Sequence, residues 1–540
     1  MPTRNDNHRK KATRRRNQAS PKHASQPSVT RVTALPGDMD ITSAAQPPFE
    51  PTTADGGAVP ALRGIPWTVI ILALVALDIL GLYVFLGRRY YLLNPVWIYL
   101  SAYGILFGLY VYASARVAPS IPRNFQRWGL IVILSGAVLY RAALIPSPPS
   151  ISTDIYRYIW DGRLTVHGIN PYRWAPNAEC LRYLRDSIWI QMEYKAYQTI
   201  YMPVSQAVFA LANAIFGNWI TGYKIIYALF DLGAIGLMIK LLDRFRQPRW
   251  KVIWYAWCPL PITEICIAGH QDILGVFLLL LTVLLATGKR RPELTAIALV
   301  AAGFTKGFAL VLLPLFVRAF GKRFAFAAFW ALVVLGMPMW VYLPKFLYGM
   351  RQYLMNVHVN SSIFYWLDQI LVPITKYHLD AVNKIADVFI ISVAAWSAWK
   401  PVTDGRDLVR RSLIVLSVTL LVVPTLFPWY LLWIIPFALV LGTRPLWAVV
   451  LLILGVNLTY VFYVSMRLYW WTPLVEYIPF YTLLIWQYIH WRRGSDAFRI
   501  IRLPRKGRRG SAGDEPDMSL QTAIKESPDL VAPEPGAHGS

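Results

Sequence analysis

Four charged side chains are concentrated in one short stretch of an otherwise apolar chain. The segment T-D-I-Y-R-Y-I-W-D-G-R, residues 153–163, contains Asp154, Arg157, Asp161 and Arg163. A positioned carboxylate can act as a general base, and neighbouring cations can stabilise an anion that develops during a reaction. If the chain is an enzyme, its chemistry is therefore expected in this segment.

The spacing of these residues predicts one charged helix face. If residues 153–166 are helical, Asp154, Arg157 and Asp161 stand at i, i+3 and i+7 and point to the same side. Arg157 precedes Asp161 by four residues, so we expect these two side chains to pair. Asp154 stands at the entry of the helix, where an aspartate is either an N-cap or a free carboxylate. We favour a catalytic carboxylate.

The composition predicts an integral membrane protein. Of the 540 residues, 56% are hydrophobic and 15% are charged, whereas soluble domains carry about 25% charged residues. Many apolar runs of about 17–25 residues indicate a polytopic α-helical protein. The formal charge of +25 comes from tails and short loops between apolar runs, which argues for membrane lipid and against nucleic acid as a partner. The three cysteines are too few for a disulfide framework.

The predicted organisation is a membrane region between two tails. Residues 1–64 are basic and then rich in Pro, Ser and Ala, which predicts a disordered cytoplasmic tail without a signal peptide. Residues 494–540 are expected to form a second disordered cytoplasmic tail. Residues 65–493 should form an all-α bundle of about 14 membrane segments. Within this bundle, residues 147–220 should form an outer catalytic loop with juxtamembrane helices.

The basic loops set the predicted orientation of the helices. The third span should exit on the outer face, so that Asp154 lies outside. To keep the later basic loops cytoplasmic, residues 202–217 are predicted to form a re-entrant or juxtamembrane helix, and the run 294–320 should turn around Thr305-Lys306-Gly307. The other predicted spans are 66–86, 95–117, 128–145, 222–242, 251–269, 272–288, 324–343, 382–399, 408–426, 429–442, 446–466 and 475–491.

Polar residues within the apolar segments gather at the predicted outer end. Ionisable residues are costly in hydrocarbon and tend to mark a substrate path. Together with Arg157 and Asp161, the candidate substrate-binding residues are Arg141, Tyr201, Glu264, His270, Asp272, Lys306 and Trp429.

Several of these candidates also have a purely structural explanation. Lys306 could snorkel to the headgroups, and Arg141 could anchor its helix there. His270 and Asp272 could cap a span. Trp429 could belong to an aromatic belt at the interface.

In its motifs the chain resembles the bacterial branch of the GT-C superfamily of polytopic glycosyltransferases. The resemblance covers about residues 128–490 and rests on D-I-Y-R-Y-I-W-D-G-R…G-I-N-P-Y, I-Y-M-P-V-S-Q, G-H-Q-D, T-K-G and F-P-W-Y-L-L-W. The nearest kind is the polyprenol-phosphate-mannose-dependent mannosyltransferases. The resemblance implies that Asp154 is the base and that Lys306 holds the lipid phosphate. Val204 stands where such enzymes usually carry a second proline, which leaves the acceptor open.

These expectations describe a glycosyltransferase of the bacterial plasma membrane. The resemblance implies transfer of a sugar such as mannose from a polyprenyl phosphate to a hydroxyl of a glycolipid or glycan. A single carboxylate base predicts inversion at the anomeric carbon. The phosphate is expected near Lys306 with Arg141 or Arg157. No cofactor is expected, because a divalent cation could assist but is not required for a monophosphate leaving group.

Two other functions are compatible with a polytopic chain of this kind. A transporter or flippase of a lipid-linked sugar would need paired polar residues near the membrane midplane and usually an internal repeat. The sequence shows no clear repeat. An enzyme of lipid-linked oligosaccharide ligation would use a diphosphate donor and should carry additional arginines around it.

Overall fold

The computed structural model describes residues 64–288, 291–465 and 471–492, and its regular elements in these residues are all helical. They comprise 21 α-helices with short 3-10 and π-helical segments between them. The predicted all-α class is thereby confirmed. The two predicted tails lie outside the described residues, apart from Gly64.

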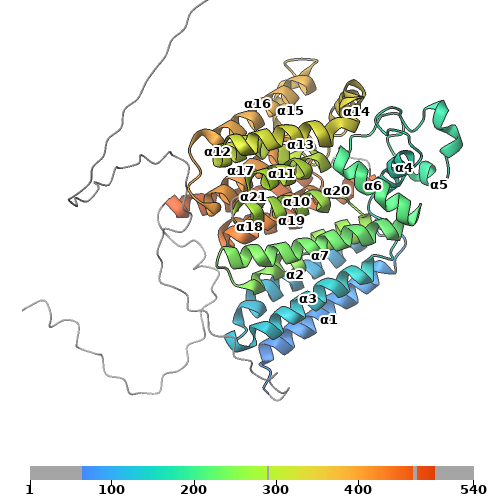
Figure 1. The fold of residues 1–540 in the computed structure, drawn as a ribbon. Helices are drawn as coiled ribbons and strands as arrows, with labels where there is room; N and C mark the ends of the chain where they lie inside the picture. The colour runs from blue at the N-terminus through green and yellow to red at the C-terminus, as the bar shows by residue number, and fades with distance from the viewer. Residues whose placement is uncertain (1–63, 289–290, 466–470, 493–540) are drawn as a thin grey trace, which may run out of the picture. The chain divides into compact units, whose positions relative to one another are not determined.

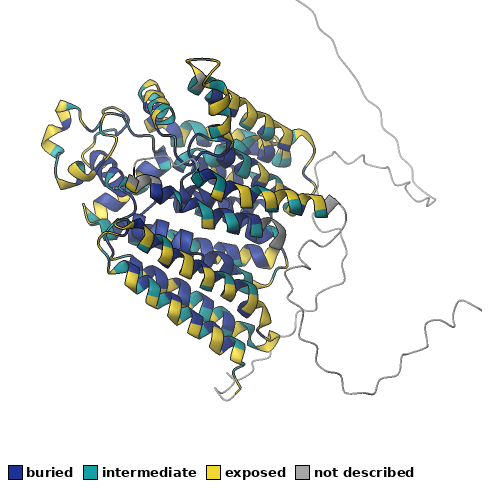
Figure 2. Ribbon diagram, turned by 180° about the vertical axis from the view of Figure 1, so that it is seen from behind, coloured by how far each residue is buried: buried dark blue, intermediate teal, exposed yellow. Residues whose placement is uncertain are grey.

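Six of the described helices are long and apolar enough to cross a membrane. Their outward sides carry large exposed apolar residues such as Leu77 and Trp97, which suit hydrocarbon rather than water. Figure 2 shows buried residues on the inward sides of the helices and exposed residues on the outward sides. The six helices are α1 (Trp67–Gly87), α2 (Val96–Tyr112) with its π- and 3-10-helical continuation to Ser120, α3 (Gln126–Leu144) with the 3-10 turn that starts at Arg123, α7 (Ile220–Arg244), α13 (Lys322–Trp340) and α16 (His378–Trp399).

Several other predicted spans are shorter or interrupted helices. The run 294–320 divides at Gly307, whose φ of +89° suits glycine, into α11 (Pro292–Lys306) and α12 (Leu313–Phe320). This break is where the sequence predicts it. Residues 251–269 divide as well, because Pro259 cannot continue the preceding helix. The resulting pieces are α8 (Ile253–Ala256), α9 (Pro259–Thr263) and a π-helix, Glu264–Ala268. The number of membrane crossings stays a prediction.

The remaining helices complete the bundle and its loops. α10 packs against both α7 and α11, and α11 packs against α13. The remaining helices are α10 (Asp272–Ala286), α14 (Leu343–Asn356), α15 (Ile363–Leu371), α17 (Gly405–Val422), α18 (Ile435–Leu441), α19 (Thr443–Val456), α20 (Thr459–Ser465) and α21 (Trp471–Arg492).

The loop between α3 and α7 contains three α-helices at one end of the bundle (Figure 1). They are α4 (Asp154–Val166), α5 (Ser187–Gln191) and α6 (Pro203–Phe216). α4 packs closely on α6 because Gly162 has no side chain: a Cβ there would lie 2.3 Å from the carbonyl oxygen of Phe209. α6 has 14 residues, fewer than the roughly 20 that a crossing needs, as expected for a juxtamembrane or re-entrant helix.

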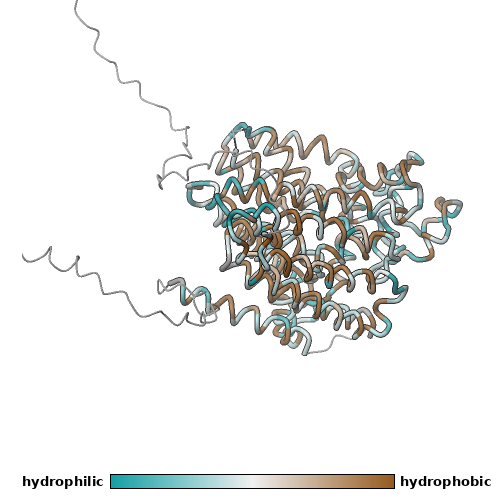
Figure 3. Tube along the Cα trace, turned by 90° about the horizontal axis from the view of Figure 1, so that it is seen from below, coloured by the Kyte–Doolittle hydropathy of each residue, from teal (hydrophilic) through white to brown (hydrophobic). Residues whose placement is uncertain are grey.

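The two ends of α10 lie in different surroundings. At its C-terminal end, Arg244 donates a hydrogen bond to the carbonyl of Thr287 (2.8 Å), and Arg406 donates to the carbonyl of Phe245 (2.9 Å). Two loops with clustered basic residues therefore meet there. The N-terminal end, about 22 Å away along the helix axis, begins with Asp272. In Figure 3 hydrophobic residues dominate the middle of the helices and hydrophilic residues gather toward their ends.

Candidate active site

A cavity of about 90 Å³ lies next to the N-terminal end of α10, where several of the predicted site residues meet. Its walls come from segments that are far apart in the sequence. They include side chains from residues 152–157, 193–201, 349–357 and 427–430, together with Lys306. The start of α4, the end of α11 and the helix α14 therefore contribute to one site.

Asp154 is the first residue of α4 and lines the cavity. The N-cap position belongs to Thr153, so Asp154 is not the N-cap residue. Its side chain is 33% exposed, and its Oδ2 lies 3.7 Å from Nε2 of His270. The carboxylate is thus held at the start of the helix with one side toward the cavity.

The environment of Asp154 raises the pKa of its carboxyl group above that of an ordinary aspartate. Burial raises the pKa of Asp154 to about 6, and the charges of Glu193 and Asp272 also raise it. The Lys306 charge and a hydrogen bond with Tyr201 lower it, but they do not outweigh burial. A carboxyl group with a pKa near 6 is a better proton acceptor than an ordinary aspartate and is still mostly ionised at pH 7.

His270 supports the start of α4 from behind. Its imidazole is fully buried, with Nδ1 3.0 Å from the Glu264 carboxylate and Nε2 3.1 Å from the hydroxyl of Ser152. Glu264 is also buried and accepts a hydrogen bond from the Tyr460 hydroxyl at 2.6 Å. The ring of His270 stacks on Trp429 with 3.6 Å between the ring centroids. Because they are buried, His270 and Glu264 hold cavity residues in place instead of facing the cavity themselves.

The local backbone explains how His270 reaches this place. A π-helix, Glu264–Ala268, is followed by Gly269 with a φ of +78°, a left-handed conformation that suits glycine. A Cβ on Gly269 would lie 2.4 Å from the Cδ1 atom of Ile155 in α4. The glycine therefore provides the sharp turn and lets α4 sit directly against it.

Lys306 ends α11 and lines the cavity from another side. Its ammonium group lies 2.9 Å from the Asp272 carboxylate and 4.2 Å from the centroid of the Tyr430 ring. The other oxygen of Asp272 accepts a hydrogen bond from the Trp433 indole at 3.0 Å. The Lys306 side chain is only 14% exposed. It is held at the cavity wall, in contrast to a snorkelling lysine, which extends to the headgroups.

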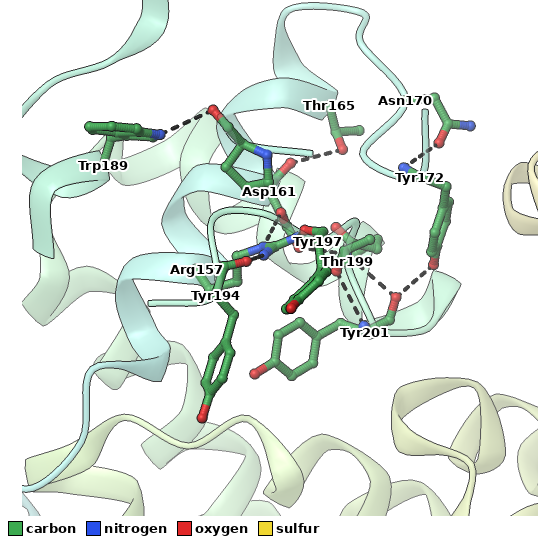
Figure 4. A network of polar contacts seen from close by, with 12 residues as sticks. Arg157, Asp161, Thr165, Asn170, Tyr172, Trp189, Tyr194, Tyr197, Thr199 and Tyr201 are labelled. Carbon is green, nitrogen blue, oxygen red and sulfur yellow. Dashed lines mark hydrogen bonds and ion pairs between the residues drawn. The ribbon is translucent and has the colours of Figure 1, made fainter. Parts of the chain in front are cut away.

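Arg157 and Asp161 form the predicted pair within α4. Arg157 donates to Asp161 at 2.9 Å and to the carbonyls of Tyr194 and Tyr197 at 3.4 and 3.3 Å (Figure 4). The second oxygen of the buried Asp161 accepts a hydrogen bond from Gln206 at 3.0 Å. Asp161 is therefore a structural partner, and Arg157 both fixes the loop over α4 and lines the cavity.

Comparison with known families gives one match. Residues 85–322 match the family model of the α-(1→6)-mannopyranosyltransferase N-terminal domain, the MptA/B family. This match supports a mannosyltransferase of the GT-C type. The matched part contains Asp154, His270 and Lys306, and the resemblance that their motifs suggest is confirmed. No curated protein and no solved structure gives a significant match.

The mannosyltransferase match also covers Arg141, but the structure places this residue away from the cavity. Its guanidinium is buried between α3 and α7, where it pairs with Asp231 and donates to the carbonyl of Ala256 at 3.0 Å. Asp231 also accepts a hydrogen bond from the Tyr255 hydroxyl at 2.7 Å. A charge inside an apolar bundle needs such partners. The expectation that Arg141 lies beside Lys306 does not fit this geometry.

Tyr201 and Trp429 both line the cavity, as expected for substrate-binding candidates. The carbonyl of Tyr201 accepts a hydrogen bond from the Tyr172 hydroxyl at 2.7 Å, which holds the start of α6 against the G-I-N-P-Y loop. Trp429 lines the cavity and also stacks on the ring of His270. Its role is therefore more than that of an aromatic residue at the membrane interface.

Sequence reasoning missed several cavity residues. Glu193 and Tyr194 come from the loop before α6, and Tyr353 comes from α14, where its hydroxyl lies 3.0 Å from that of Tyr430. Polar and aromatic residues are common in loops and amphipathic helices of this kind, so no sequence signal marks these three. The described residues contain no group of three or more His, Cys, Asp or Glu side chains that could hold a metal ion. A reaction without a metal stays a prediction.

Proposed function

We propose that this protein transfers a mannosyl group from a polyprenyl phosphate to an acceptor hydroxyl on the outer face of the plasma membrane. The observation that carries the proposal is the placement of Asp154 and Lys306 in the walls of one cavity. One is a carboxylate suited to accept a proton, and the other is a cation suited to receive an anionic leaving group. The family match supports mannose as the sugar.

Asp154 acts as the general base in this proposal. It takes the proton of the acceptor hydroxyl while the hydroxyl oxygen bonds to the anomeric carbon. The bond from that carbon to the phosphate oxygen breaks, and its electron pair leaves with the lipid phosphate. One displacement by one base inverts the anomeric configuration.

Lys306 stabilises the leaving phosphate. A lysine ammonium has three N–H donors, and the bond to Asp272 leaves the others available for phosphate oxygens. Asp272 also fixes the direction of the ammonium group, so that it need not reorganise during the reaction. Arg157 is a second cation in the cavity wall, held by Asp161 and two carbonyls.

His270 and Glu264 act as positioning residues for Asp154. His270 contacts the Ser152 hydroxyl, which in turn accepts a hydrogen bond from the backbone N–H of Asp154 at 3.3 Å. Glu264 fixes the orientation of the imidazole ring through Nδ1. A base that is held in this way spends little time in conformations that cannot accept the proton.

The distribution of basic residues supports the outer location in this proposal. Loops with clustered arginines meet at one end of α10, and the cavity lies at the other end. Basic loops are retained on the cytoplasmic side. The cavity is then open to the outer leaflet, where a polyprenyl lipid can place its phosphate at the level of Lys306.

Transfer by the purified full-length protein in lipid vesicles tests the proposal. Radiolabelled polyprenyl-phosphate mannose serves as donor and a short α-mannoside as acceptor. We expect Asp154→Asn to lower transfer by at least about 10²-fold and to leave donor binding intact. Glu179→Gln is the matched control, because Glu179 is an exposed carboxylate of the same loop, outside the cavity. Full activity of Asp154→Asn would remove the basis of the proposal.

The same variant separates this function from a transporter or flippase. The feature that favours transport is the ion pair of Arg141 and Asp231 inside the bundle, because buried charge pairs often line ion paths. A transporter would keep most of its lipid-linked sugar movement after Asp154→Asn, because the residue lies outside the membrane-spanning helices. An enzyme would lose turnover.

A further inference from the structure

Two adjoining cavities lie beside the turn that ends α4, and both are lined by residues 168–170. The larger cavity, of about 340 Å³, extends past α6 to Pro338 of α13 and has mainly apolar walls. The smaller cavity, of about 220 Å³, is lined by Arg173, Trp174 and Tyr342. Together they form a groove with an apolar part and a cationic, aromatic part.

Two cations lie near one indole ring at the cationic part: Arg173, which lines the smaller cavity, and Lys345 beside it. The Lys345 ammonium lies 4.8 Å from the centroid of the Trp174 ring, and the Arg173 guanidinium lies 5.3 Å from the same centroid. Lys345 also donates to the carbonyl of Arg173 at 2.9 Å. In the described part of the chain the contacts of these two cations are with the Trp174 and Tyr342 rings and a carbonyl, not with a carboxylate. Most of the eight N–H donors of the two groups are therefore available for an anion.

The apolar part of the groove adjoins the end of a membrane span. α13 is a candidate span that ends at Trp340, and Lys345 follows five residues later. Met337 and Val341, on either side of the groove residue Pro338, are 59% and 68% exposed, as expected for residues that face lipid. Trp and Tyr at the end of a span mark the level of the headgroups. The two cations therefore stand at headgroup level.

We propose that this groove binds an anionic phospholipid of the leaflet on this side of the membrane. Its phosphate lies between Arg173 and Lys345, and one acyl chain follows the apolar wall toward Pro338. Cations at the membrane surface attract anionic lipids, and a phosphate accepts charge-assisted hydrogen bonds from both residues. The bound lipid would tie the loop after α4 to the end of α13.

A purely structural role does not account for both cations. Asn170 already ties the loop to α13 by donating to the carbonyl of Pro338 at 2.9 Å, and Lys345 adds a second tie through the carbonyl of Arg173. The exposed guanidinium of Arg173 takes part in neither of these two hydrogen bonds. Both positive charges lie near the Trp174 ring, and an anion that contacts both would offset their repulsion.

Native mass spectrometry of the full-length protein in detergent, titrated with phosphatidylglycerol or phosphatidylcholine, tests this site. We expect phosphatidylglycerol to bind preferentially, and each cation removed to weaken its binding about fivefold. The test variant is Arg173→Gln/Lys345→Gln. The matched control is Arg182→Gln/Lys376→Gln, an exposed arginine and an exposed lysine that do not line the groove.

Three results would overturn the proposal: unchanged phosphatidylglycerol binding by the test variant, equal weakening in the control, or full competition by soluble glycerol phosphate. The last result would indicate a site for a free anion instead of a lipid. Melting temperatures in phosphatidylcholine show whether both variants fold. The site depends on the membrane setting and not on the proposed reaction, so either can fail alone.

Discussion

At the scale of single residues, the carboxylates around the cavity differ in how they are neutralised. Asp161 and Asp272 each contact a cation at 2.9 Å, whereas the nearest cationic or imidazole nitrogen to Asp154 is that of His270 at 3.7 Å. A carboxylate oxygen that already accepts a charge-assisted hydrogen bond from a cation is less available to take a proton from an acceptor hydroxyl. Asp154 keeps its basicity, while its neighbours serve to hold Arg157 and Lys306.

The pH dependence of transfer follows from this difference. A base must be ionised, and the pKa of Asp154 is raised to about 6. We expect kcat/KM to be constant above about pH 7 and to fall as the pH decreases through 6, approaching tenfold per pH unit. Initial rates between pH 4.5 and 8 measure this profile. Constant rates down to pH 5 would mean that Asp154 titrates near its ordinary value or is not the base.

At the scale of elements, the sequence predicted individual helices and helix breaks better than it predicted the contacts between helices. α4, α6 and the break at Gly307 are local, because they follow from helical spacing, from a short apolar run and from a glycine. The partner of Arg141 is Asp231, 90 residues away, and only tertiary packing brings the two together. The contribution of Tyr353 depends on how α14 folds over the cavity, and no local pattern encodes that.

The turn at Gly269 connects two elements of the site and gives a prediction at this scale. An alanine there must adopt a left-handed φ, which costs about 1–2 kcal/mol, and its Cβ would collide with Ile155. We expect Gly269→Ala to displace the first turn of α4 and to lower kcat by at least about tenfold. Steady-state kinetics together with a melting curve measure both effects.

Gly236→Ala is the matched control for this prediction. Gly236 lies in α7 with no atom within 4 Å of an added Cβ, so the same change should be neutral there. If Gly269→Ala unfolds the protein, Ile155→Val in the same chain should restore part of the stability, because it removes the Cδ1 atom that the new Cβ meets. Wild-type kinetics of Gly269→Ala would show that the turn does not position Asp154.

At the scale of the whole described bundle, the cavity and the short loops around Arg244 and Arg406 lie at opposite ends. The cavity, the groove beside residues 168–170 and α4–α6 lie beyond one end of the long helices, and the loops around Arg244 and Arg406 lie at the other. The sequence predicted this separation because the same rule that orients membrane helices places arginines and lysines in cytoplasmic loops. It could not predict the cavity itself, since that depends on packing among α4, α10, α11 and α14.

The orientation of the bundle can be tested with the native cysteines. Cys180, in the loop between α4 and α5, is exposed, whereas Cys258 and Cys266 are buried. A membrane-impermeant maleimide should therefore label intact cells at Cys180, because that loop lies on the cavity side. Cys180→Ser should abolish the labelling. Lys400→Cys on the Cys180→Ser background introduces an exposed thiol at the other end, which should react only after permeabilisation. The reverse pattern would place the cavity in the cytosol, and the proposed transfer on the outer face would then be untenable.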